Sequence, residues 1–365
     1  MKELGLTEVV LDDKCYLYGK LPATEGKKEI PALGFIAHMD TVSDFCDHEI
    51  RPMVTENYDG GDLVLGTSGL VLSPKEFPHL TGLKGRTLLT SDGTTILGAD
   101  DKAGIAEILT MIERIQTENR PHGMICVAFT PDEEIGMGAE HFNLDQFGAE
   151  YAYTLDGDSE GEIQYENFNA CKAEFKIRGF NVHPGEGKDT MINASLVAIE
   201  INNCLPSMET PRGTEDYEGF YHLISMQGEV GEAKLNYIVR DHDKNGFEER
   251  KKTLRLIEKN LNAKWGEGTV TLKITDQYLN MKEIVEEHMH LIDHAKKACE
   301  AAGVAPLILP IRGGTDGCQL SFKGLPCPNL GTGGHAFHGP YEHISVEGME
   351  KSVELLLALI QEYTK

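Results

Sequence analysis

The chain has 365 residues, of which 40% are hydrophobic, 25% charged and 7% aromatic, a composition typical of a globular protein with two or three domains. Its 34 Lys and Arg residues against 59 Asp and Glu residues give a net charge of −25, which would repel phosphate backbones and anionic lipid. Nucleic acid and membrane surfaces are therefore excluded as expected partners.

The chain also lacks the sequence signals of export and of disulfide bonding. No apolar run approaches membrane-spanning length, and acidic residues interrupt the first stretch where a signal peptide would be apolar. The eight cysteines are scattered and form no CxxC pair. We therefore expect a cytoplasmic protein with reduced, mostly buried thiols.

In the first half of the chain, short apolar runs alternate with segments whose apolar residues recur with the period of a helix. Between two of these runs, residues 101–115 place five Ile and Leu side chains on one helical face, which predicts a strand–helix–strand crossover and a parallel sheet. Near the chain end, residues 307–310 and 346–363 predict a further strand and helix of the same layer. The predicted buried strands of the first half are residues 32–37, 95–99, 124–129 and 151–155.

The middle of the chain has the predicted order β-α-β-β-α-β, which is that of a split βαβ sandwich able to fold on its own. The fold class is therefore α/β, with a mainly parallel central sheet in residues 1–167 and 281–365 and an inserted α+β domain in residues 168–280. The predicted elements of the insertion are strands 173–177, 219–227, 234–240 and 270–275 and helices 191–204 and 247–261.

Acidic and imidazole residues follow the predicted strands of the first half. His38 and Asp40 come after the first strand and lie on one side of it, because strand side chains repeat every two residues. Taken singly, such patterns are usually solvated faces or helix first turns. The carboxyl ends of parallel strands, however, converge on one crevice. The carboxylates after the next three predicted strands are Asp100-Asp101, Glu133-Glu134 and Asp156.

Converging carboxylates repel one another unless a cation lies among them. His and carboxylate ligands without cysteine suit zinc, cobalt or manganese, and this number of donors suffices for a pair of metal ions. The sequence therefore predicts a metal centre at the strand ends.

The segments GFIAHMDT, TILGADDKAG, AFTPDEEIG and YTLDGD resemble those of the M20 metallopeptidases, and among them the bacterial tripeptide aminopeptidases. The resemblance continues through NVHPGEGKD, YIVRDHD, PIRGGTDGCQLSFKGLPCPNL and FHGPYEH, so it covers nearly the whole chain. It implies a zinc-peptidase catalytic domain, with the insertion as a lid or dimerisation domain, and it is compatible with a homodimer.

The resemblance also implies two zinc ions per subunit, with cobalt or manganese as alternatives. Asp100 would bridge the two ions, and the Asp100-Asp101 peptide bond would be cis. His38 and Asp156 would complete one site. Glu134 and His338 would complete the other.

Five further residues match functional positions of the family. Asp40 would orient His38, and Glu133 would be the general base. Three residues match substrate-contacting positions: His183, Arg240 and Arg312. For the substrate α-amine, the sequence offers only Asp158 and Glu160, which follow Asp156.

The activity that these parts imply is release of the N-terminal residue of short peptides, preferentially tripeptides, by metal-activated water. Two alternatives stay open. The first is another amidase of the same architecture, such as a dipeptidase, carboxypeptidase or N-acyl amino acid hydrolase. The second is a binding protein without metals, against which the intact ligand set argues. Members of the family begin with an additional helical stretch before the segment matched by residues 4–11, so we expect the native protein to be longer at its amino end.

Overall fold

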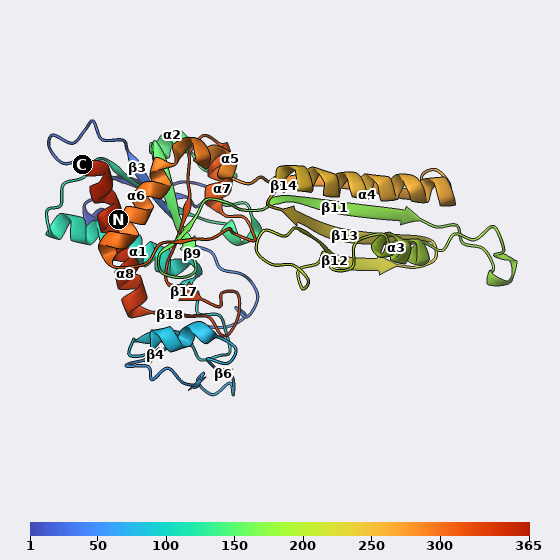
Figure 1. Ribbon diagram of the computed structural model, residues 1–365, viewed down its shortest axis with the longest axis horizontal. Coiled ribbons are helices and arrows are strands. Elements are labelled where there is room, and N and C mark those ends of the chain that lie inside the picture. The colour runs from blue at the N-terminus through green and yellow to red at the C-terminus, as the bar shows by residue number, and fades with distance from the viewer. The chain divides into compact units, whose positions relative to one another are not determined.

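The computed structural model describes residues 1–365, which divide into two compact units (Figure 1). Unit 2 contains Pro310–Gly314, a segment that the sequence analysis assigned to the first domain. Backbone hydrogen bonds account for this placement, because Ile311 N–H donates to Glu166 at 2.8 Å. Unit 1 comprises Met1–Tyr165, Met281–Leu309 and Thr315–Lys365, and unit 2 comprises Glu166–Asn280 and Pro310–Gly314.

Unit 1 is built on an eight-stranded sheet with the strand order β1-β2-β8-β3-β9-β16-β10-β15. The four strands β8, β3, β9 and β16 pair in parallel, as the predicted crossover requires. The strands are β1 Thr7–Leu11, β2 Leu17–Leu21, β3 Leu33–His38, β8 Ile125–Thr130, β9 Tyr151–Gly157, β10 Glu162–Gln164, β15 Leu307–Ile308 and β16 Asn329–Gly331.

Helices cover both faces of this sheet, so β3 and β8 are buried along their whole length and their sequences are continuous apolar runs. On one face, the Tyr153 hydroxyl donates to Leu291 of α6 and lies 3.0 Å from the Tyr363 hydroxyl of α8. On the other face, Phe147 of α2 and Leu320 of α7 join one apolar cluster with strand residues. The helices are α1 Ala99–Thr117, α2 Leu144–Phe147, α5 Lys282–Val285, α6 His290–Ala302, α7 Asp316–Phe322 and α8 Val346–Thr364.

A second, antiparallel sheet of unit 1 has the order β17-β18-β7-β4, and β5 and β6 form a separate pair. Short 3₁₀ turns complete the unit: η1 Lys2–Leu4, η2 Pro78–Leu83, η3 Glu133–Ile135 and η5 Glu286–His288. The strands are β4 Pro52–Thr55, β5 Leu63–Val64, β6 Val71–Leu72, β7 Leu88–Ser91, β17 Gly334–His335 and β18 His343–Ser345.

The strand predicted at residues 95–99 is wrong. Residues 95–98 are irregular, Ala99 begins α1, and the nearby strand β7 belongs to the antiparallel sheet. Ile96 is buried, which explains its apolar character. Other segments satisfy the backbone, since Ile96 N–H donates to the Phe45 carbonyl, the Ser91 hydroxyl donates to the Thr95 carbonyl and the Glu342 carboxylate accepts from Leu97 N–H. No strand ladder is then needed.

Unit 2 confirms the predicted order β-α-β-β-α-β. Its sheet is antiparallel throughout, with the order β12-β13-β11-β14. The elements are β11 Asn169–Arg178, η4 Pro184–Glu186, α3 Ala194–Asn203, β12 Phe220–Gly228, β13 Glu232–Asp241, α4 Lys244–Trp265 and β14 Val270–Tyr278.

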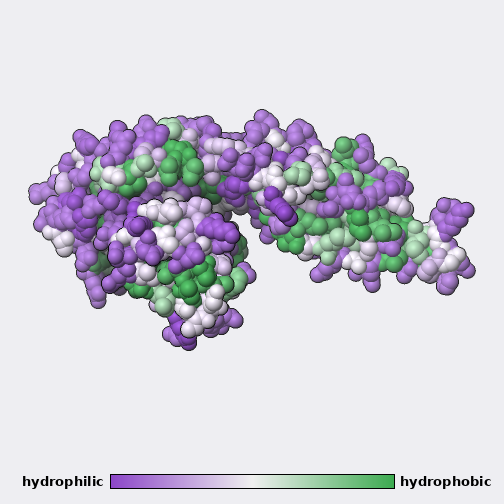
Figure 2. All heavy atoms as spheres, turned by 60° about the horizontal axis from the view of Figure 1, so that its bottom comes forward, coloured by the Kyte–Doolittle hydropathy of each residue, from purple (hydrophilic) through white to green (hydrophobic).

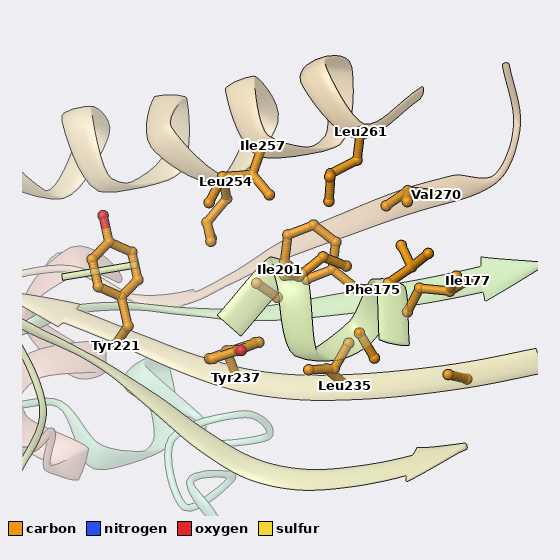
Figure 3. Close-up of a cluster of buried hydrophobic side chains, with 14 of the residues drawn as sticks. Phe175, Ile177, Ile201, Tyr221, Leu235, Tyr237, Leu254, Ile257, Leu261 and Val270 are labelled. Carbon is orange, nitrogen blue, oxygen red and sulfur yellow. The ribbon is translucent and has the colours of Figure 1, made fainter. Parts of the chain in front are cut away.

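One face of the unit 2 sheet carries its apolar core (Figure 3). Phe175 and Ile177 alternate along β11, and Leu235 and Tyr237 alternate along β13, so all four point to the same side. Side chains of α3 and α4 fill the same cluster, which means that both helices cover this one face. The opposite face of β11 is polar, with an exposed Lys172.

Polar side chains dominate the molecular face shown in Figure 2, in keeping with the net charge of −25. Five of the eight cysteines are buried, which confirms the prediction of mostly buried thiols. None of the helices combines the length and the apolar character that crossing a bilayer requires.

Candidate metal centre

Three parallel strands of unit 1 deliver side chains to one edge of the sheet. His38 is the last residue of β3, Glu133 and Glu134 follow β8 in the turn η3, and Asp156 lies near the end of β9. These strands are neighbours in the sheet, so their carboxyl ends meet as predicted. Asp100 instead reaches the cluster from the start of α1.

Asp100 lies at the centre of the cluster. Its Oδ1 is 2.8 Å from His38 Nε2, and its Oδ2 is 2.9 Å from His338 Nε2. His38 Nε2 is also 3.4 Å from Asp156 Oδ1, and His338 Nε2 is 3.2 Å from Glu134 Oε2. One carboxylate therefore faces two imidazoles, each of which has a further carboxylate beside it.

His338 comes from the loop between β17 and β18 and has a backbone φ of 63°, a left-handed conformation that is uncommon for residues other than glycine. Its side chain is 54% exposed, whereas those of His38 and Asp100 are buried. The cluster is thus closed on the β3 side and open on the His338 side. The Asp100-Asp101 peptide bond is cis, as the family resemblance implies.

Asp40 ties two of the segments together. Its Oδ1 accepts a hydrogen bond from Glu133 N–H and its Oδ2 accepts one from Glu134 N–H, both at 3.1 Å. Asp40 Oδ1 also lies 3.4 Å from His38 Nδ1, whose nearest acceptor is the Asp40 carbonyl at 3.1 Å. Asp40 is therefore placed to orient both His38 and the two glutamates.

Other buried polar side chains hold the remaining segments in the same way. The Asp101 carboxylate accepts from His38 N–H at 3.0 Å, and Asn329 Oδ1 accepts from Asp156 N–H at 3.1 Å. Glu134 Oε1 accepts from Val42 N–H at 3.1 Å. Such outer contacts fix the direction in which a ligand side chain points.

Electrostatics within the cluster favour an added cation. Burial alone would lower the pKa of His38, but hydrogen bonds to Asp100 and Asp156 raise it well above its ordinary value. Hydrogen bonds to Asp100 and Glu134 raise the pKa of His338 to about 10. Burial raises the pKa of Asp156 to about 6. Because carboxylates outnumber imidazoles, the group attracts positive charge, which a divalent ion would supply.

The donor atoms are also close enough for metal binding. One ligand atom of each of His38, Asp100 and Glu134 lies within 4.8 Å of the other two, and His38, Glu133 and Asp156 form a second such group. Nitrogen and carboxylate donors without sulfur fit zinc, cobalt or manganese. The residues present therefore fit a metal centre of the predicted kind.

Glu133 has the environment of a proton acceptor. Burial, and after it the charge of Asp156, raises the pKa of Glu133 well above its ordinary value. A carboxylate with a raised pKa is better matched to accept and return a proton near neutral pH. Glu133 and Glu134 leave the turn in different directions, since only Glu134 lies beside His338.

Three predicted substrate-binding residues lie in unit 2. His183 is exposed, and its Nδ1 accepts from Gly185 N–H at 3.2 Å, so the neutral ring carries its proton on Nε2. Arg240 is buried, and its Nη1 donates to the Val239 carbonyl at 3.0 Å. The guanidinium of Arg312 donates to backbone carbonyls and to the Thr214 hydroxyl.

The two acids suggested for the α-amine differ in their contacts. Glu160 pairs with the guanidinium of Arg86. Burial of the carboxyl group, followed by the charge of Asp100, raises the pKa of Asp158. Asp158 is thus the one of the two that has no arginine beside it.

Three further residues of the site were given no role of their own from the sequence, although Asp101 was noted beside Asp100. Asp101 and Glu342 accept backbone hydrogen bonds beside the ligands, and burial raises the pKa of Asp316 to about 7. All three lie in segments that resemble the family, as GADDKAG, FHGPYEH and RGGTDG. The sequence showed only that each of them is an acidic residue within a matched segment. This does not reveal which backbone N–H group such a residue contacts.

Fold and donor set together are those of a metal-dependent hydrolase with a parallel sheet. Residues 93–362 match peptidase family M20/M25/M40. Over its full length, the chain is 52% identical to peptidase T of Caldanaerobacter subterraneus subsp. tengcongensis and covers 90% of that protein. It is 54% identical to peptidase T of Desulfitobacterium hafniense, of which it covers 89%.

Solved structures agree with this relationship. The aminopeptidase PepT of Bacillus cereus superposes with a TM-score of 0.80 at 26% identity, covering 100% of this chain and 90% of that one. A tripeptidase of Staphylococcus aureus has the same fold, with a TM-score of 0.80 at 23% identity, covering 99% of this chain and 90% of that one. The chain belongs to peptidase family M20/M25/M40, which confirms the resemblance and the fold class inferred from the sequence.

Proposed function

We propose that this chain is a tripeptide aminopeptidase whose active site holds two zinc ions. The observation that carries the proposal is Asp100, whose two carboxylate oxygens lie 2.8 Å from His38 Nε2 and 2.9 Å from His338 Nε2. The identity of 52% to a peptidase T over the whole chain supports the choice of substrate.

The five ligands would divide into two sets that share Asp100. His38 with Asp156 would hold one ion, and Glu134 with His338 would hold the other. A bound metal pair would lower the pKa of a water molecule and polarise the scissile carbonyl. Cobalt or manganese would suit the same donors.

The residues of the chain would supply the proton transfers. Glu133 would take a proton from the attacking water and deliver it to the nitrogen of the leaving amine, so that the peptide bond breaks as the new carbon–oxygen bond forms. Asp40 would keep Glu133 in place through the backbone hydrogen bond of 3.1 Å. Glu133 is within 4.8 Å of ligand atoms of His38 and Asp156, which supports a role at the water and leaves ligation as the competing assignment.

Substrate recognition would use charged and polar groups. The Nε2–H of His183 is a suitable donor to the developing oxyanion. Arginine forks suit the substrate carboxylate, and Arg240 and Arg312 remain the proposed groups. Asp158 is the proposed partner of the α-amine, because Glu160 already pairs with Arg86. A cytoplasmic location and a homodimer also remain predictions.

Hydrolysis of a matched series of di-, tri- and tetrapeptides tests the proposal. With zinc, cobalt or manganese added, we expect fastest turnover of the free tripeptide and release of its N-terminal residue. The N-acetylated tripeptide is the control, and its turnover should fall to background. Equal turnover of the acetylated and free peptides would instead favour an N-acyl amino acid hydrolase.

A further inference from the structure

The turn of residues 97–100, which leads into helix α1, has no local acceptor for the N–H groups of Leu97, Gly98 and Asp100, although Asp101 Oδ1 accepts from Gly104 N–H further along at 3.1 Å. The residue before the first turn of the helix is Gly98, which has φ 77° and no side chain to accept hydrogen bonds from the exposed N–H groups. Asp100 and Asp101 have non-helical backbone angles within this turn. The first N–H groups of a helix need acceptors from elsewhere, and an unmet buried donor is costly.

Glu342 supplies these acceptors from a distant part of the chain. Its Oε2 accepts from Leu97 N–H at 2.6 Å and from Gly98 N–H at 2.8 Å, and its Oε1 accepts from Asp100 N–H at 3.0 Å. The Glu342 side chain is 1% exposed, so water does not compete for these bonds. One carboxylate thus accepts from three N–H groups of residues 97–100 and so holds the backbone of Asp100.

The backbone of Glu342 is itself firmly placed. Glu342 N–H donates to the Gly339 carbonyl at 3.1 Å. The next residue, His343, is fully buried and pairs with Thr90 in the antiparallel sheet. Its Nδ1 lies 2.7 Å from the Tyr341 carbonyl oxygen. Because its backbone is held in this way, the Glu342 carboxylate can fix the positions of the N–H groups that donate to it.

Glu342 also connects two ligand segments. It follows His338 by four residues in one loop, while its carboxylate binds the turn that carries Asp100. Asp100 in turn faces both His38 and His338. A shift of residues 97–100 would therefore move the proposed bridging ligand away from both histidines.

We propose that Glu342 is a positioning residue of the metal centre, which fixes residues 97–100 so that Asp100 faces His38 and His338 at the same time. The inference rests on the proposed two-metal function. It concerns metal binding, however, and can be judged without peptide turnover.

The test compares two glutamates that both accept backbone N–H groups. Glu342→Gln keeps the size of the side chain but loses the charge and one acceptor oxygen. Glu347→Gln is the matched control, because Glu347 accepts from Thr87 N–H at 2.9 Å and lies in the first turn of α8, on a segment without a proposed ligand. Metal affinity is measured by competition with a chelator, and ligand geometry by the visible spectrum of the cobalt-loaded protein.

We expect Glu342→Gln to weaken metal binding by roughly 10- to 100-fold and to change the cobalt spectrum. Glu347→Gln should leave the metal affinity within about twofold, as expected for a residue that is not near a ligand. Unchanged affinity and spectrum in Glu342→Gln would overturn the proposal, whatever its thermal midpoint. Wild-type protein that binds two metal ions but cleaves no tripeptide would refute the proposed function and leave this inference standing.

A measurement on the wild-type chain applies if Glu342→Gln does not fold. Amide hydrogen exchange at Leu97, Gly98 and Asp100 should slow by at least about tenfold when zinc is added, because metal binding and the Glu342 contacts stabilise the same turn. The Thr87 amide, held by Glu347, is the internal control and should change little. Equal changes at both places would overturn the proposal.

Discussion

The turn before helix α1 in unit 1 and the start of helix α3 in unit 2 are held in different ways. In unit 2, Asn193 caps α3 locally, since its Oδ1 accepts from Leu196 N–H at 3.3 Å. In unit 1, Asp101 caps α1 locally, but the N–H groups of residues 97, 98 and 100 donate to Glu342, which is 244 residues after Gly98.

The local cap can be recognised from the sequence because Asn is a preferred residue before a helix and lies three positions from its partner. The remote acceptor Glu342 cannot be recognised from the sequence, since no residue near Gly98 indicates it. We infer that the remote arrangement serves the site. A carboxylate from another segment can hold a ligand in place, whereas a local cap stabilises only its own helix.

The largest expected effect is that of removing metal. A chelator should reduce tripeptide hydrolysis to background, because the proposed nucleophile depends on bound metal, and added zinc should restore it. It should also loosen the turn of residues 97–100 while leaving the core of unit 2 unchanged. Activity assays and amide exchange of the same sample check both parts. Full activity after exhaustive chelation would contradict the two-zinc mechanism.

The two adjacent glutamates should respond differently to the same substitution. Glu133→Gln cannot take a proton at neutral pH, so turnover should fall by roughly 10²- to 10⁴-fold while zinc remains bound. Glu134→Gln removes a charged ligand and should release one metal ion. Zinc content and turnover are measured for both variants. If Glu133→Gln loses zinc and Glu134→Gln keeps it, the roles are reversed.

A substitution in the core of unit 2 should lower the stability of this unit and leave metal binding unchanged. Leu235 is fully buried among side chains of the sheet and the two helices (Figure 3). Leu235→Ala should lower the free energy of unfolding of this unit by about 2–5 kcal/mol, from lost burial and the cavity left behind. Denaturant unfolding measures the effect, and metal affinity should stay unchanged. The control is Ile224→Ala in β12, a residue that is 56% exposed, which should cost less than about 0.5 kcal/mol.

The smallest effect concerns the local cap of α3. Asn193→Ala should cost about 1 kcal/mol in unfolding free energy, because it leaves an N–H of the first turn without its side-chain acceptor. Metal affinity and the cobalt spectrum should be unaffected, in contrast to Glu342→Gln. A change of the cobalt spectrum in Asn193→Ala would show that a local cap also affects the metal centre, which would contradict the proposed difference between the two arrangements.

Elements with one buried face were predictable from the sequence. Along β11, Ala173, Phe175 and Ile177 point into the core and alternate with polar residues, so period two was plain in the sequence. The apolar run at residues 95–99 misled the same reasoning, because Ile96 is buried in an irregular segment whose hydrogen bonds go to the Phe45 carbonyl and to the side chains of Ser91 and Glu342. The periodicity of apolar residues indicates which side chains are buried. It does not indicate which groups the backbone N–H and C=O groups bond to.

The candidate ligands were partly predictable for a related reason. His38, Glu134 and Asp156 follow strands of a parallel sheet, and the carboxyl ends of such strands must meet. His338 lies in a loop after a short antiparallel strand, and only the resemblance to the family indicated it. Asp101 was noted only as one of the converging carboxylates and Glu342 was missed, because the role of each depends on which backbone N–H group lies in front of it.

The sequence by itself determined the order of elements in unit 2, the parallel core of unit 1, the chemical type of the donors and the family. These depend on local periodicity, on residue chemistry and on matched segments, all of which can be read along the chain. Only the tertiary structure decided that Pro310–Gly314 joins unit 2 and that Glu342 holds residues 97–100. These are contacts between residues up to about 245 positions apart, and hydrogen bonds over such separations depend on the fold and leave no spacing in the sequence.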